Sequence, residues 1–165
     1  MNELRPESAA NGERNTINIG SPKASILQTL ISIARSIRAL LSLRLAELGL
    51  GSGQDEILLS LQSGESASTA ILATRLDLRE TSLSKLLEPL IAKGLIERVG
   101  EMRDARRMVV RISHAGTAMQ ERVQGIWNEI GNDLVGPMGS EQLDRLITEL
   151  EGMQKTMNSR LTRFS

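Results

Sequence analysis

The chain has 165 residues, 40% of them hydrophobic, which fits one globular helical domain or a small domain with an extension. It holds 20 Lys and Arg against 20 Asp and Glu and no cysteine, which excludes disulfides, thiolate catalysis and cysteine-based metal or redox sites. With no net charge, attraction to a polyanion must come from how the charges are distributed along the chain.

The charges are distributed unevenly. From Arg75 to Arg111 nine Lys and Arg accompany six Asp and Glu, whereas residues 112–139 hold one Arg and three acidic residues. The middle of the chain is therefore basic, and the segment that follows it is acidic.

The first 22 residues are polar, rich in Asn, Ser and Gly, and without periodicity. This composition is typical of a mobile arm, so we expect residues 1–22 to form one. The segment lacks the basic start and apolar centre of a signal peptide, and a cytoplasmic location is expected.

From residue 23 apolar side chains recur at steps of three and four, which predicts one long helix that ends near Gly49. The apolar stripe is wider than one small domain needs, which implies a partner helix. Arg35, Arg38 and Arg44 would be costly inside a bilayer, so we expect an amphipathic helix and no membrane partner.

Three short helices are predicted next. The first spans residues 54–61, and the second follows the N-cap candidate Ser68 and ends near Arg75. The third has leucines at i, i+3, i+4 and i+7 and stops at Gly94. The turn between the second and third helices has the length found in a helix-turn-helix.

The start of the third helix has two interpretations. Asp77 and Glu80 match a capping box, which predicts an early start, whereas the alternative places Arg79 at the helix tip. The expected apolar face consists of Leu83, Leu86, Leu87 and Leu90.

Two further apolar runs, residues 95–99 and 108–112, predict strands joined by the eight-residue loop 100–107. The loop carries three arginines and two acidic residues. Such a loop costs self-repulsion and contributes nothing to the core, so we expect it to contact an anion. We expect Asp104 to pair with Arg106 and hold its guanidinium extended.

Two long helices are predicted to complete the chain. Ser113 is a candidate cap for a helix that buries Trp127 and breaks at Gly131, Gly136 and Pro137. The last helix begins near Ser140, and its apolar residues repeat at near-heptad spacing.

The third short helix has the side chains that reading a major groove requires. Thr81, Ser82 and Lys85 are small polar or cationic residues on the side opposite the leucines. Taken alone, each is more typical of an ordinary solvated helix surface than of a DNA contact. Arginines at the hairpin tip suit the narrow minor groove. The expected contacts with double-stranded DNA are Arg79, Thr81, Ser82, Lys85, Arg103, Asp104, Arg106 and Arg107.

Several of these motifs together resemble the signature of MarR-type winged helix-turn-helix regulators. The matching features are Gln54, Leu72-Ala73, Arg75-Leu76, the run from Thr81 to Arg98, Asp104-x-Arg106 and Ser113-x-x-Gly116. The resemblance implies a mainly α protein with a β-hairpin wing and no enzymatic activity. It implies a homodimeric regulator, expected to be a repressor, with a dimerisation helix at 23–50, a DNA-binding lobe at 51–112 and C-terminal dimerisation helices at 113–165.

The resemblance also implies release from DNA by a small aromatic or amphipathic acid. The effector would lie among the first helix, the Gln54 helix and the Trp127 helix, with Arg35 or Arg38 facing its carboxylate and Trp127 stacking on it. A tryptophan such as Trp127 is more often a core residue than a stacking surface, and arginines such as Arg35 and Arg38 are more often solvated.

Other function classes have less support in the sequence. A helical interaction module that binds an acidic protein through the arginine-rich hairpin is the alternative hypothesis. With one histidine, no Ser/His/Asp set can be completed, and there is no Gly-rich phosphate loop. His114 at a helix start is typical of a surface or capping residue, so neither a cofactor nor a metal is expected.

Overall fold

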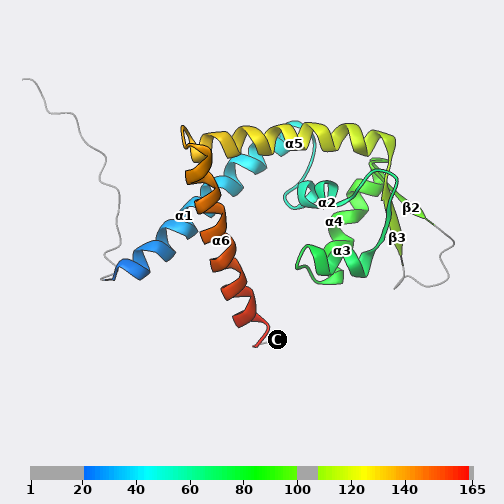
Figure 1. The fold of residues 1–165 in the computed structure, drawn as a ribbon. Coiled ribbons are helices and arrows are strands. Elements are labelled where there is room, and N and C mark those ends of the chain that lie inside the picture. The colour runs from blue at the N-terminus through cyan, green and yellow to red at the C-terminus, as the bar shows by residue number, and fades with distance from the viewer. Residues whose placement is uncertain (1–20, 100–107, 164–165) are drawn as a thin grey trace, which may run out of the picture. The chain divides into compact units, whose positions relative to one another are not determined.

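A computed structural model describes residues 21–99 and 108–163 (Figure 1). The chain divides into two compact units, residues 1–36 and 37–165. The helices are α1 (Pro22–Glu47), α2 (Gln54–Ser60), α3 (Thr69–Arg75), α4 (Glu80–Ala92), α5 (His114–Val135) and α6 (Ser140–Leu161). The strands are β1 (Ser66–Ser68), β2 (Ile96–Val99) and β3 (Val109–Ile112). The predicted mobile arm, residues 1–22, lies almost entirely outside the described residues.

The long first helix predicted from the apolar periodicity is confirmed as α1. In the first unit it carries a group of exposed apolar side chains, namely Ile26, Leu27, Leu30, Ile31 and Ile33. By length and composition alone α1 is long and apolar enough to cross a membrane. This is weak support for a membrane span, because core helices of soluble proteins meet the same two criteria.

The core of the second unit lies among α2, α3, α4 and the strands, which Figure 1 shows side by side, and α1 and α5 contribute Leu45 and Val123 to it. It consists of apolar residues that are almost fully buried, and the largest are Leu45, Ile57, Leu58, Leu72, Leu83, Leu87, Leu90, Ile96, Val110 and Val123. Ile71 of α3 lies outside this core and is 55% exposed. The short helix α3 turns only a narrow face toward the core, and Leu72 and Ala73 occupy that face.

The three strands form an antiparallel sheet in the order β1-β3-β2. Strands β2 and β3 confirm the predicted hairpin, with Val99 opposite Val109 and Ile96 opposite Ile112. Strand β1 was not predicted, because Ser-Ala-Ser contains no β-branched residue. It forms because the free edge of β3 supplies backbone partners for it.

The capping box predicted at Asp77 is wrong. Asp77 has a positive φ of 52°, and the Leu78 N–H donates to the Ala73 carbonyl, so Asp77 closes α3 instead of opening α4. Aspartate tolerates this left-handed conformation better than most residues. Helix α4 therefore starts at Glu80 with Arg79 as its N-cap residue, which was the alternative interpretation.

Helices α5 and α6 confirm the two long C-terminal helices, but α5 continues through Gly131, which was expected to break it. A glycine within a helix costs only about 1 kcal/mol, which the rest of the helix can offset. The helix ends where Gly136 adopts a positive φ of 55°.

The first turn of α5 is joined tightly to the end of α4. The Ser113 hydroxyl donates to the Gly94 carbonyl at 2.6 Å and accepts the Gly116 N–H at 2.9 Å. Gly116 lies so close to Leu95 that a Cβ would overlap with the Leu95 carbonyl oxygen and lie 2.7 Å from Ile112 Cγ1. This contact explains why the Ser-x-x-Gly motif follows the wing.

We predict that Gly116→Ala lowers the free energy of unfolding by about 2 kcal/mol, because the added methyl group forces the backbones of α5 and Leu95 apart. The matched control is Gly125→Ala in the same helix, where an added Cβ meets nothing within 4 Å. The control is expected to raise stability by about 0.5–1 kcal/mol. Urea unfolding of both variants measures the difference. Equal midpoints for Gly116→Ala and the unmodified chain would contradict the close contact.

Candidate nucleic-acid interface

Helix α4 presents its polar face to solvent. Leu83, Leu87 and Leu90 are fully buried, whereas Thr81, Ser82 and Lys85 on the opposite side are exposed. The leucine spacing produces this orientation, because residues three and four apart lie on one side of a helix. The predicted reading residues of α4 thus share one accessible surface near its N-terminus.

Arg79 precedes this surface. It is exposed, has an extended backbone (φ −71°, ψ 142°), and its carbonyl accepts the N–H groups of Ser82 and Leu83. Its side chain makes no hydrogen bond to the first-turn amides of α4. A helix N-terminus of this kind favours a negative charge.

Two contacts attach α4 to the segment between α1 and α2. The Lys93 ammonium donates to the Gly49 carbonyl, and the Gln54 side-chain amide donates to the Leu86 carbonyl at 3.4 Å. Gln54 also accepts the Gly51 N–H at 2.8 Å, which fixes its orientation. The polar face of α4 is therefore held at both the middle and the end of the helix.

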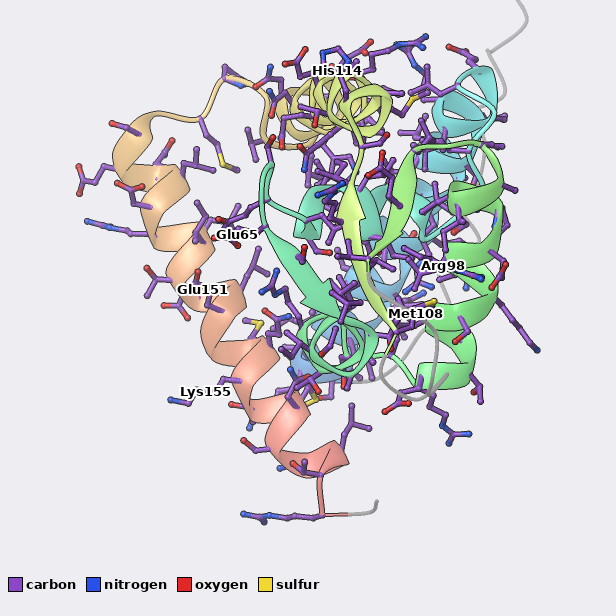
Figure 2. All side chains as sticks on the ribbon, turned by 90° about the vertical axis from the view of Figure 1, so that its right-hand side faces the viewer. Glu65, Arg98, Met108, His114, Glu151 and Lys155 are labelled. Carbon is purple, nitrogen blue, oxygen red and sulfur yellow. The ribbon has the colours of Figure 1, made fainter. Side chains whose placement is uncertain are left out.

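Ion pairs connect the described wing strands to each other and to α4. Arg111 on β3 contacts Glu97 on β2 at 2.9 Å, which joins the two strands across the sheet. Arg98 on β2 contacts Glu88 on α4 at 2.5 Å, and Figure 2 shows Arg98 beside the wing strands and α4. These surface pairs contribute little stability, but they set the direction of charged side chains.

The predicted tip residues Arg103, Asp104, Arg106 and Arg107 lie outside the described residues. The strands that flank the tip are paired up to Val99 and Val109. Met108, labelled in Figure 2, accepts the Thr69 N–H at 2.9 Å and so joins the wing to the start of α3.

Sequence reasoning missed the residues that hold the reading surface in place. Glu88, Lys93 and the β1 strand have no local signal, because each acts through a partner far away in sequence. Ser84 is also exposed on α4, but its hydroxyl donates to the Glu80 carbonyl at 2.9 Å within the same helix.

A cavity of about 330 Å³ lies near the predicted effector residues. Its lining consists of Arg38, Leu41, Leu45, Ser52, Gly53, Asp55, Glu56, Leu78 and Leu86. Arg38 of α1 thus lines a cavity together with residues of α2, whereas its lining includes no residue of the Trp127 helix, α5. Arg35 belongs to the first unit and is an exposed residue of α1.

Trp127, predicted to stack on the effector, is 39% exposed and does not line the cavity. Its indole N–H donates to Asp55 Oδ2 at 3.0 Å, and Asp55 is only 2% exposed. Trp127 does not line the cavity itself, but it orients the carboxylate of Asp55, which is a lining residue.

The comparisons with known proteins agree with this geometry. Residues 50–116 match the family model of a winged helix DNA-binding domain. No curated protein matches the chain significantly.

Several solved structures share the fold. A MarR transcriptional regulator from Methanosarcina mazei Go1 is 19% identical, with a TM-score of 0.72 over 82% of this chain and 98% of that chain. A mutant MarR from E. coli complexed with operator DNA is 19% identical, with a TM-score of 0.67 over 78% of this chain and 93% of that chain. An S. aureus MepR–DNA complex is 22% identical, with a TM-score of 0.67 over 81% and 97%, respectively. The predicted fold class, a mainly α winged helix-turn-helix protein, is confirmed.

We predict that Trp127→Phe lowers the free energy of unfolding by about 1–3 kcal/mol, because a buried carboxylate oxygen loses its donor. A double-mutant cycle with Asp55→Ala, followed by urea unfolding, isolates the hydrogen bond from the lost ring contacts. Additive effects of the two changes would show that the indole and the carboxylate do not interact.

Proposed function

We propose that this winged helix protein, which has the fold of the MarR transcriptional regulators, is a dimeric, effector-responsive repressor. The match of residues 50–116 to a winged helix DNA-binding domain supports DNA as the partner of the chain. The observation that carries the proposal is the polar, solvent-facing side of α4, which lies within that domain. Its Thr81, Ser82 and Lys85 are of the types that contact base edges and phosphates.

In this proposal α4 enters the major groove by its N-terminal end. Thr81 and Ser82 contact bases, Lys85 contacts a phosphate, and Arg79 together with the first-turn amides contacts the backbone beside the groove. The wing arginines, Arg103, Arg106 and Arg107, enter the adjacent minor groove, where the negative potential is strongest when the groove is narrow.

Dimerisation is proposed from the apolar side chains of the terminal helices. Within the described part of the chain helix α6 buries none of its residues. It exposes Ile147, Leu150, Met153, Met157 and Leu161 at steps of three and four. Soluble monomers rarely leave so long an apolar stripe in water. A dimer covers it and presents two copies of α4 to half-sites about 34 Å apart.

The cavity beside Arg38 is the proposed effector site. Its volume of about 330 Å³ is within the range of small-molecule pockets, about 300–1,000 Å³. Leu86 belongs to α4 and Leu78 to the turn before it, so an effector in this cavity touches the reading helix directly.

We expect Lys85→Ala to weaken binding to every duplex and to lower the salt dependence by about one phosphate contact. Thr81→Ala should change which operator sequence is preferred. Lys155→Ala in α6, shown in Figure 2, removes the same charge from a different helix and serves as the control. Fluorescence anisotropy with a duplex from the region upstream of the chain's own gene measures both effects. No binding to this duplex at low salt would overturn the proposed function.

We also expect a dimer in sedimentation equilibrium, and a monomer when Leu150 and Met157 are both changed to glutamate. Two charges in the apolar stripe oppose burial of that stripe against a partner helix. Lys155→Glu places a negative charge on α6 outside the stripe and should leave the dimer intact. A dimer that survives the double change would assign the interface to other residues.

A further inference from the structure

We propose that the cavity of the second unit binds a small apolar molecule through a protonated amine, with Asp55 as the partner of the ammonium group. The inference deepens the proposed effector site and rests on the proposed function for its regulatory consequence. It replaces the acid expected from the family resemblance with a ligand of opposite charge.

The walls of the cavity are apolar where they are deepest in the fold. Leu45 is almost fully buried, and Leu41, Leu78 and Leu86 pack against the core as partly buried residues. These four side chains come from α1, from the turn before α4 and from α4 itself. They form a surface for a hydrocarbon body such as a phenyl ring.

The polar residues of the lining divide into two groups by burial. Arg38 and Glu56 are exposed, and because their charges are opposite, the exposed part of the lining has no net charge. Asp55 is buried, and within residues 21–99 and 108–163 it forms no ion pair. The buried part of the lining therefore carries one uncompensated negative charge.

The carboxylate of Asp55 is only half satisfied by the protein. Its Oδ2 accepts the Trp127 indole N–H at 3.0 Å, while no donor to Oδ1 is present in the part of the chain that the structure describes. Its position in the first turn of α2 offsets part of the cost of burial. A buried charge still favours a partner of opposite sign, and an ammonium group supplies both the charge and the hydrogen bond.

A carboxylate ligand fits the same cavity poorly. Its anionic end would be drawn to exposed Arg38, where water screens the attraction, and its body would lie beside the buried negative charge of Asp55. The arrangement thus selects a cation for the part of the site beside Asp55.

The binding experiment uses the full chain and its own fluorescence. Trp127 is the one tryptophan of the chain and there is no tyrosine, so the emission reports on the indole bonded to Asp55. The probes are 2-phenylethylamine, 2-phenylethanol and 3-phenylpropanoate, which share a phenyl ring and a similar length but differ in charge. We expect saturable changes in Trp127 emission with the amine, at concentrations about tenfold below those required by the alcohol.

Two variants test the site itself. Asp55→Asn keeps the shape and removes the charge, and it should weaken amine binding about tenfold while leaving the alcohol unchanged. Leu41→Phe adds a larger side chain to the apolar wall of the cavity and should weaken binding of both. Glu65→Gln, an exposed carboxylate in the turn before β1, is the matched control and should behave like the unmodified chain. Circular dichroism verifies that each variant is folded. If Asp55→Asn is unfolded, the comparison of the three probes and the Leu41→Phe variant still test the amine site.

The outcomes separate this inference from the proposed function. Tighter binding of 3-phenylpropanoate than of the amine, or an amine affinity that Asp55→Asn does not change, overturns the amine site. On the same protein, in the absence of the three small molecules, fluorescence anisotropy measures binding to duplex DNA. DNA binding without amine binding refutes the inference alone, whereas loss of DNA binding by the unmodified chain refutes the proposed function.

Discussion

The contact between the first turn of α5 and the end of α4 is the constraint on which the arrangement of the lobe depends. Ser113 bonds the Gly94 carbonyl, and Gly116 has no side chain, so α5 can begin against the Leu95 backbone. Leu95 leads directly into β2. The position of the wing and the direction of α5 are therefore both set by the place where α4 ends.

This constraint gives α4 two structural roles. Its buried leucines hold the core, and its termini and backbone carbonyls connect it to the α1–α2 loop through Lys93 and Gln54. A helix held at several points moves as a rigid body. Movement of α4 must then shift the wing, to which Glu88 and Arg98 also join it.

The sequence predicted the features that depend on local periodicity and composition. The leucine spacing identified α4 and its exposed face, and Ser113 identified the start of α5. Asp77 was misassigned because an aspartate before a helix suits both a cap and a left-handed turn, and only the length of α3 decides between them. The β1 strand and the Asp55–Trp127 bond depend on partners that only the fold brings together.

The position of the cavity has an energetic consequence for regulation. A ligand shifts an equilibrium only by the difference between its affinities for the two states. Leu78 and Leu86 line the cavity and flank the residues proposed to read DNA, so the cavity volume changes whenever α4 moves against α1. In the proposed function, effector binding and DNA binding favour different positions of α4. Linkage requires the effect to be reciprocal: operator DNA must weaken effector binding by the same factor by which the effector weakens operator binding.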